Sequence, residues 1–522
     1  MFDYILADGL VADGSGRPLF AADVGIRGER IETVSPPGEL NTAAGRERIQ
    51  AAGLILCPGF IDLHSHADLA LLEDPRDIPK VLQGVTTEVF SSCGLGFAPL
   101  TAENKSSLQT LYGPLFGPTR NVKWDWETIP EFIERLDRGA SVNVAYQAAH
   151  GPIKLAVMGA EDRRPTAREI ARMAALVGEA LDGGALGLST GLAYAPMTYS
   201  HAPELVALTS EVARRDGLFS IHLRSYAETI DKAVEEAVRV AAESGARLQI
   251  SHFMVWGSAN RGRAAEYGEW IERARAAGVD VGFDAYPYAA GSTVASLNLP
   301  AWSADGGPQR QLARLRDAAE RRRIIEEMRP QQEIWRHSTI AGVKTEKNRP
   351  LEGKNFAAAA KQAGQDVLEF LCDLLIEEEL EVAHILHLGS EEDMRRLMLH
   401  PAHSFGSDGL HLEGRPHPRL YGAFPRVLGR YVREEKLLPL EQAIYKMTAG
   451  NAARLGLTDR GIVAKGQAAD LVLFDPQKVI DRATYEHPRQ PPDGIRLVMV
   501  NGTPTLREGR PTGATPGRVL RR

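Results

Sequence analysis

Short apolar runs alternate with longer amphipathic stretches through most of the chain beyond about residue 54. The runs have the length of buried strands and are bounded by glycine, proline and polar residues, so each one predicts a strand. Eight runs follow in this order: 54–63, 85–92, 142–149, 185–189, 218–223, 247–252, 279–284 and 402–407. Eight strands alternating with helices favour an α/β fold, a (β/α)8 TIM-like barrel, over an open sheet.

Two of the intervening stretches carry clear helix signals. Thr166 and Glu169 have the spacing of a capping box, and the apolar periodicity that follows them ends at 182–184, Asp-Gly-Gly. The stretch 227–243 repeats small apolar residues at helical spacing and ends at 244–245, Ser-Gly. Both stretches predict helices that connect consecutive strands of the barrel.

The two ends of the chain have a different texture, with short alternating segments punctuated by glycine. This pattern predicts small strands and turns, and we expect residues 1–56 and 457–522 to pair into one small β-sandwich domain. The barrel would then take 57–456. Its rhythm breaks after 285, which predicts an inserted segment at about 287–345.

The composition narrows the function classes. The chain has 522 residues, 43% of them hydrophobic, and a formal net charge of −7, so it carries no electrostatic footprint for nucleic acid. No apolar run approaches the length of a membrane span, and the first residues lack the pattern of a signal peptide. The only cysteines are Cys57, Cys93 and Cys372, which argues against a disulfide framework and favours a cytoplasmic protein.

Candidate metal ligands stand at the ends of five predicted strands. The first run ends in His64 and His66, which project to the same side because side chains alternate along a strand. Further candidates follow the second, fifth, sixth and eighth runs: Cys93, His222, His252 and Asp408. Because the carboxyl ends of barrel strands meet at one rim, this joint placement predicts a divalent-metal site.

Each of these residues alone has an ordinary structural interpretation. A single histidine at a strand end is more often a hydrogen-bonded structural residue, and Asp408 within Ser-Asp-Gly is typical of a turn. A lone cysteine is usually small core filling, and for Cys57 and Cys372 we keep that interpretation. Only the recurrence of such residues at the same end of five predicted strands favours a metal site over structural roles.

Several longer segments resemble a known enzyme group. The His-Ser-His motif, the two single histidines and Asp408 are similar to the metal-dependent amidohydrolase superfamily. Within it, the segments 91–100, 185–197, 284–293 and 406–429 resemble the N-acyl-D-amino acid deacylases, also called D-aminoacylases. The fourth predicted strand contains no lysine to bridge two metals, and in this branch a cysteine after the second strand takes that role.

The resemblance implies a zinc-dependent hydrolysis of linear amides. It implies one tight Zn²⁺ position at Cys93, His222 and His252, and a weaker divalent position at His64, His66 and Asp408 that could share the thiolate. Thiolate and imidazole ligands with an open place suit zinc and select against magnesium or calcium. The resemblance also gives Asp408 the proton transfer between the attacking water and the leaving nitrogen.

An N-acyl amino acid carries a free carboxylate, and the resemblance supplies candidates to bind it. Arg419 is the candidate for a bidentate clamp, with Tyr286 and Ser292 as further contacts. Tyr194 and Arg224 are weaker candidates for contacts to the scissile carbonyl or the substrate.

The chain departs from the deacylase pattern at one position. The family usually has a lysine two residues after the sixth-strand histidine, where this chain has Met254. The loss of one charge-assisted contact weakens binding of the substrate carboxylate by about 1.5–3 kcal/mol. We therefore expect a hydrophobic D-side chain in the substrate, or a substrate that lacks a free carboxylate.

Three alternatives remain open from the sequence. A cyclic amidohydrolase of the hydantoinase or dihydroorotase type would need a carboxylated lysine, for which Lys154 is the candidate. A deaminase would not be expected to have Cys93 or the segment 406–429. A catalytically inactive metal-binding scaffold would bind zinc without turnover.

Overall fold

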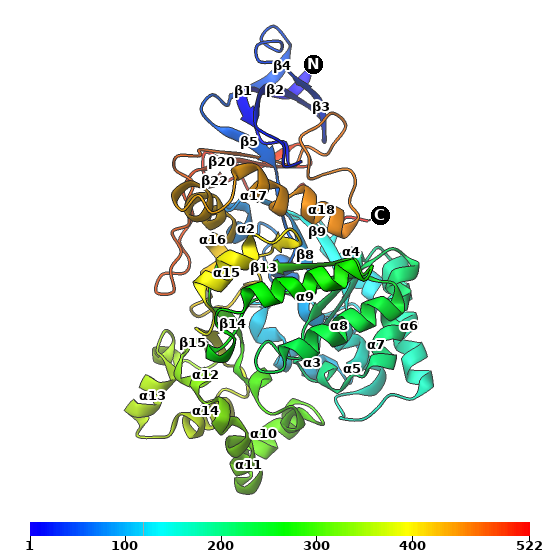
Figure 1. Ribbon diagram of the computed structural model, residues 1–522, viewed down its shortest axis with the longest axis vertical. Coiled ribbons are helices and arrows are strands. Elements are labelled where there is room, and N and C mark those ends of the chain that lie inside the picture. Colours follow the sequence, from blue (N-terminus) through cyan, green and yellow to red (C-terminus); the bar gives the residue numbers. More distant parts are fainter. Residues whose placement is uncertain (118, 522) are drawn as a thin grey trace.

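The computed structural model describes residues 1–117 and 119–521 and places an eight-stranded parallel barrel at the centre of the molecule (Figure 1). The barrel strands are β6 (Phe60–Asp62), β8 (Val85–Phe90), β9 (Asn143–Ala149), β10 (Gly187–Gly191), β11 (Leu218–His222), β12 (Arg247–Ile250), β13 (Val281–Ala285) and β17 (His403–Phe405). All eight coincide with apolar runs of the sequence, and the predicted barrel is confirmed.

The sheet is hydrogen-bonded in the order β17-β13-β12-β11-β10-β9-β8-β6, so the first and last strands flank a seam. The side-chain amide of Asn451 spans this seam by donating to the carbonyls of Ile61 and Phe405, at 2.7 and 2.9 Å. Just beyond the seam, β7 (Ser65–His66) pairs in parallel with β18 (Gly409–Leu410). The two-residue strands thereby hold the His-Ser-His segment beside Asp408.

The connecting helices follow the capping signals in the sequence. Helix α6 (Ala167–Asp182) begins after a capping box in which Thr166 and Glu169 satisfy each other's backbone N–H groups. Helix α8 (Ile230–Ser244) ends at Gly245, whose φ of 75° is the left-handed conformation that glycine adopts without a Cβ clash. Both helices bury one apolar face against the barrel.

Strands from both chain ends share one nine-stranded sheet, which lies at the top of Figure 1. The N-terminal strands are β1 (Phe2–Val11), β2 (Phe20–Arg27), β3 (Arg30–Ser35), β4 (Gly45–Gln50) and β5 (Ile55–Pro58), and the C-terminal strands are β19 (Leu471–Phe474), β20 (Ile495–Val500), β21 (Thr503–Arg507) and β22 (Arg510–Pro511). The central contact is the antiparallel pairing of β19 with β5. The run 54–63, predicted as one strand, therefore splits at Gly59 into β5 of this sheet and β6 of the barrel.

A separate lobe follows the seventh barrel strand and lies at the opposite end of the molecule from the N-terminal sheet (Figure 1). It contains a three-stranded sheet of β14 (Gly291–Val294), β16 (Ala383–Leu386) and β15 (Ser338–Gly342). Five helices complete it: α10 (Pro308–Arg316), α11 (Ala318–Met328), α12 (Glu333–Arg336), α13 (Phe356–Ala363) and α14 (Val367–Glu377). Its apolar core is distinct from that of the barrel, and the lobe extends to Leu386, beyond the boundary of 345 expected from the sequence.

Within the described part of the chain, no helix combines the length and the apolar character needed to cross a bilayer.

Candidate metal centre

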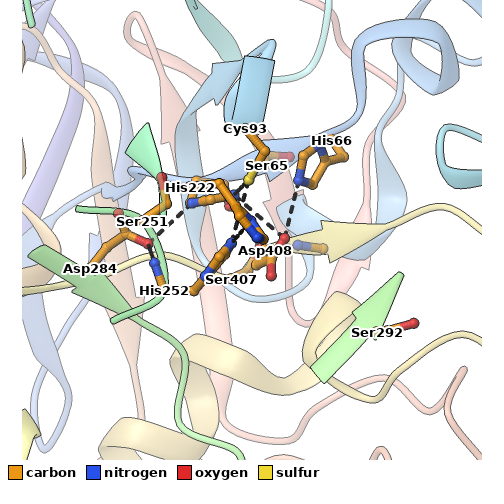
Figure 2. Close-up of polar contacts among 12 residues, drawn as sticks. Ser65, His66, Cys93, His222, Ser251, His252, Asp284, Ser292, Ser407 and Asp408 are labelled. Atoms are coloured by element: carbon orange, nitrogen blue, oxygen red, sulfur yellow. Dashed lines mark hydrogen bonds and ion pairs between the residues drawn. The ribbon is translucent and has the colours of Figure 1, made fainter. Parts of the chain in front are cut away.

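The candidate ligands lie at the carboxyl-terminal rim of the barrel: His222 ends β11, His66 lies in β7, and Cys93, His252 and Asp408 lie just after strands. Three of them have positive φ angles: Cys93 at 57°, His252 at 33° and Asp408 at 51°. Such backbone conformations are unfavourable for residues with a Cβ and persist where the surrounding structure imposes them, often at functional sites. These turns aim the side chains toward the barrel axis (Figure 2).

The thiol of Cys93 lies at the centre of one cluster of imidazoles. Its Sγ atom is 3.3 Å from His64 Nε2 and 3.4 Å from His252 Nε2, and His252 Nε2 is 2.9 Å from His222 Nδ1. Atoms bound tetrahedrally to one zinc ion lie about 3.3–3.6 Å apart, given zinc–nitrogen and zinc–sulfur bonds of about 2.0–2.3 Å. Cys93, His64 and His252 therefore have the spacing of ligands to one ion, whereas His222, expected from the sequence in this group, contacts His252 and lies outside the group.

A second cluster shares His64 and brings in Asp408. Asp408 Oδ1 lies 3.1 Å from His66 Nε2 and 3.5 Å from His64 Nε2. The three side chains are almost completely buried, and their ligand atoms lie close enough together to hold a second ion. The two clusters meet at His64.

The charges around His64 show that this region favours a cation. Burial alone would lower the pKa of His64, but the neighbouring carboxylates of Asp284 and Asp408 act in the opposite direction, and the pKa lies well above its usual value. Burial lowers the pKa of both His66 and His252 to about 4, so these two imidazoles are neutral and free to donate a lone pair. The donor set of thiol, imidazole and carboxylate fits a zinc-type ion.

Asp284, at the end of β13, orients His64. Its Oδ1 atom lies 3.1 Å from His64 Nδ1 and also accepts the backbone N–H of His252 at 2.9 Å. With Nδ1 engaged, His64 presents Nε2 to Cys93 and Asp408. A carboxylate behind a ligating imidazole is the common arrangement at metal sites.

Tyr226 supports the other two imidazoles. Its ring packs against His222 and His252, with centroid separations of 4.9 and 5.1 Å. Its hydroxyl donates to the carbonyl of Ser251 at 2.7 Å and accepts the backbone N–H of Leu223 at 3.1 Å. The ring thus ties together the turns that carry both histidines.

A fully buried guanidinium lies beside Asp408. Arg419 Nη1 is 2.9 Å from Asp408 Oδ2, and Nη2 donates to the carbonyl of Ser292 at 3.2 Å. The guanidinium also lies 4.4 Å above the ring of Tyr286. Burial would raise the pKa of Asp408, but Arg419 and His64 hold it well below its usual value, so the carboxylate is ionised.

A cavity of about 220 Å³ opens onto these groups. Its polar floor contains His66, Cys93, His222, His252 and Asp408, and its other walls contain Tyr194, Tyr286 and Ser292 together with the apolar residues Leu95, Leu115, Trp256, Leu386, Leu388 and Leu410. Several of these wall residues belong to the inserted lobe. The barrel therefore supplies the ligands, and the lobe closes one side of the cavity.

Three candidate substrate residues are not among those that line this cavity: Arg224, Met254 and Arg419, which lies buried against Asp408. Arg224 is held outside it, because its guanidinium pairs with Glu236 at 2.9 Å and donates to the carbonyls of Thr198 and Ser200. Met254 is 1% exposed and packs in the apolar core, whereas its neighbour Trp256 lines the cavity. The chain leaves the strand conformation after β12, and the turn that follows places Trp256 rather than Met254 in the cavity wall.

The remaining sequence candidates have structural roles. Lys154 donates to Glu204 at 2.7 Å and to Ser200 at 3.0 Å, so its ammonium is held in a buried ion pair. Its buried ion pair removes the geometric basis for the carboxylated lysine of a hydantoinase-type site. Cys57 and Cys372 are free and buried in apolar surroundings, as interpreted from the sequence.

Asp284 and Tyr226 are not among the residues predicted from the sequence. Asp284 ends the seventh apolar run, at the same rim position as the chosen ligands, so its strand-end placement was an available signal. Tyr226 lies four residues after His222 in an irregular turn, and nothing in the local pattern distinguishes it from a surface tyrosine.

Comparison with known proteins agrees with this geometry. Residues 47–506 match the amidohydrolase family. The chain is 37% identical to the D-aminoacylase of Alcaligenes xylosoxydans xylosoxydans, over all of this chain and 98% of that protein, and 36% identical to its N-acyl-D-glutamate deacylase, over all of this chain and 96% of that protein. The crystal structure of N-acyl-D-glutamate deacylase from Bordetella bronchiseptica, in complex with zinc and a phosphonate inhibitor, superposes with a TM-score of 0.85 at 33% identity and full coverage of both chains.

The family match covers most of the chain, and the full-length identity is well above the level at which only a fold is shared. The chain belongs to the amidohydrolase family, as a metal-dependent member of its N-acyl-D-amino acid deacylase branch.

Proposed function

We propose that the protein hydrolyses the amide bond of N-acyl-D-amino acids with hydrophobic side chains, with zinc as its metal. The observation that carries this proposal is the convergence of Cys93, the imidazoles and Asp408 on the floor of an apolar cavity with Arg419 beside them. The D configuration follows from the likeness to D-amino acid deacylases.

Zinc would be held tightly by Cys93, His222 and His252, and a second, weaker divalent ion by His64, His66 and Asp408. The contacts of Cys93 to His252 and of His66 to Asp408 support two positions, and His64, whose Nε2 is 3.3 Å from Cys93 Sγ and 3.5 Å from Asp408 Oδ1, lies between them. When bound, zinc lowers the pKa of a coordinated water to about 7 and polarises a carbonyl group.

Asp408 is the group that moves the proton. Its carboxylate is ionised and faces the cavity, so it can accept a proton from the attacking water. It then passes this proton to the amide nitrogen, which must leave as a neutral amine. His66, whose Nε2 lies 3.1 Å from Asp408 Oδ1, holds the carboxylate in one orientation.

Arg419 would bind the free carboxylate of the substrate. Its Nε atom is buried without a hydrogen bond and its Nη1 atom meets only the carboxylate of Asp408, so the guanidinium keeps donor capacity for a second carboxylate. The guanidinium would exchange its contact with Asp408 for the substrate carboxylate, with Tyr286 beneath it and Ser292 at its edge. Tyr194, which lines the cavity beside His222, would contact the acyl part.

The walls of the cavity support a hydrophobic substrate side chain. Five leucines and Trp256 contribute to them, and no lysine or arginine is among the described residues that line the cavity. Desolvating a carboxylate without a cation is costly, so an acidic substrate side chain would be disfavoured. A leucine-sized side chain buried there would contribute about 1.5–3 kcal/mol.

A kinetic comparison of four substrates tests the proposal. With zinc added, we expect kcat/KM to be highest for N-acetyl-D-leucine and lower for N-acetyl-L-leucine, N-acetyl-D-glutamate and N-acetyl-D-leucinamide. Faster turnover of the glutamate compound would contradict the hydrophobic preference. Equal turnover of the leucinamide would contradict the carboxylate role of Arg419, and bound zinc without any turnover would support the inactive scaffold.

A further inference from the structure

A fully buried lysine lies behind the metal-ligating turns and contacts none of the ligands directly. Lys80, in helix α2 (Ile78–Val81), has no exposed surface. Its Nζ atom donates to Asp62 Oδ2 at 2.7 Å, to Ser65 Oγ at 3.0 Å and to Glu88 Oε1. All three N–H donors of the ammonium are therefore used.

The charges of this cluster keep the lysine in its ammonium form. Burial alone would lower the pKa of Lys80, but Asp62 and Glu88 raise it. Burial would likewise raise the pKa of Glu88, which Lys80 instead holds at about 2. The nearby Asp77 is neutral, because burial and the charge of Glu88 raise its pKa well above the usual value.

The hydrogen bonds of Lys80 lead to both turns that carry the second metal cluster. Ser65 lies between His64 and His66 in the sequence and begins β7. Asp62 accepts the backbone N–H of Ser407 at 2.7 Å and also its hydroxyl. Ser407 immediately precedes Asp408, whose own N–H donates to the carbonyl of His64 at 2.8 Å.

These contacts make one ammonium the junction between the two sides of the barrel seam. Asp62 ends the first barrel strand and Ser65 follows it. Ser407 follows the eighth strand and is linked to Lys80 by its hydrogen bonds to Asp62. In contrast, within the described chain no hydrogen bond joins Lys80 to the turns of His222 or His252, which Tyr226 and Asp284 hold instead.

We propose that Lys80 is a positioning residue that sets the affinity of the divalent-metal position formed by His64, His66 and Asp408, while leaving the Cys93 position largely unaffected. This inference rests on the two metal positions of the proposed function. Residues that orient metal ligands from behind typically change metal affinity by roughly 10- to 100-fold. Loss of the ammonium would free the two turns to move apart and leave Asp62 and Glu88 uncompensated.

The test is a zinc titration of the metal-free protein against a chromophoric chelator, with wild type and Lys80→Met. We expect the second equivalent of zinc to bind roughly 10- to 100-fold more weakly in the variant, and the first equivalent to bind as in wild type. Lys154→Met is the matched control, because Lys154 is an equally buried lysine with an ion pair to Glu204 and no contact to the metal-ligating turns. Its two zinc affinities should equal those of wild type.

Ser407→Ala provides a milder variant in case Lys80→Met does not fold. It removes the hydroxyl contact to Asp62 without changing the charge, and we expect a smaller loss at the second position only. Normal second-site binding in either folded variant, or an equal loss in Lys154→Met, would overturn the role of Lys80. A wild-type protein that binds a single equivalent would overturn this inference together with the second metal position, whereas the substrate comparison tests the deacylase activity separately.

Discussion

His64 and Asp284 form a buried hydrogen-bonded pair at the rim of the barrel, with His64 Nδ1 3.1 Å from Asp284 Oδ1. The two residues are 220 positions apart and come from the first and seventh strands. Because the carboxylate engages Nδ1, the imidazole turns Nε2 toward Cys93 and Asp408, where both metal clusters meet. This pair fixes the ligand that the two clusters share.

Replacing Asp284 with alanine should therefore weaken metal binding. The substitution removes the partner of His64 Nδ1 and the acceptor for the backbone N–H of His252. We expect zinc affinity to fall by roughly 10- to 100-fold, measured by chelator competition. Asp280→Ala is the control, because that carboxylate is half exposed and pairs with Arg454 away from the site. A metal affinity of Asp284→Ala equal to that of the control would contradict the orienting role.

Replacing Asp408 with asparagine should separate proton transfer from tight metal binding. The amide keeps the shape of the carboxylate but cannot accept the proton of the attacking water. We expect kcat to fall by roughly 10²–10⁴-fold, while zinc at the Cys93 position remains bound. Metal content and turnover measured on the same sample decide the outcome. A rate near that of wild type would show that another group transfers the proton.

Replacing Arg419 with methionine should remove the preference for a substrate with a free carboxylate. In wild type we expect N-acetyl-D-leucine to exceed N-acetyl-D-leucinamide in kcat/KM by roughly 10- to 100-fold, the value of a charge-assisted contact. In Arg419→Met the ratio of the two substrates should approach unity. Using a ratio corrects for the loss of the contact to Asp408, since both substrates experience that loss equally. An unchanged ratio would rule out the clamp.

Zinc binding should displace a proton from Cys93. Burial raises the pKa of this thiol above its usual value, with His64 opposing the effect only in part, so the metal-free protein carries a thiol at neutral pH. Zinc binds the thiolate, and its apparent affinity should therefore rise with pH, by about tenfold per pH unit for each proton displaced. Calorimetry in buffers of different ionisation enthalpy counts the released protons.

The matched variant for this measurement is Cys93→Ala. It should release fewer protons on zinc binding than wild type does. Equal proton release in the two proteins would show that the thiol is not the group that the metal deprotonates.

The barrel was predictable because apolar runs and capping signals are local. Eight runs became the eight strands, and Thr166 with Glu169 began a helix as expected. The extent of the inserted lobe was harder to predict, because β16 pairs with both β14 and β15 across stretches of helix. Such pairing depends on contacts between distant residues. The split of 54–63 at Gly59 has the same origin, since its two halves look equally apolar in the sequence.

The metal-ligating residues were predictable for a related reason: strand ends of a parallel barrel meet at one rim. The residues behind them were not. Lys80 looks like an ordinary surface lysine in the sequence, and only the fold shows that it is buried between two carboxylates. For Arg224 the prediction was wrong. Its position beside His222 suggested a substrate contact, but in the fold its guanidinium pairs with Glu236.

All of these predictions depend on the Cys93 sulfur and the imidazoles at the barrel rim binding the same ion. X-ray absorption at the zinc edge of the zinc-loaded protein measures this most directly. We expect a zinc–sulfur distance of about 2.3 Å together with nitrogen ligands at about 2.0–2.1 Å. A spectrum with nitrogen and oxygen ligands only would place the metal away from Cys93 and contradict the account.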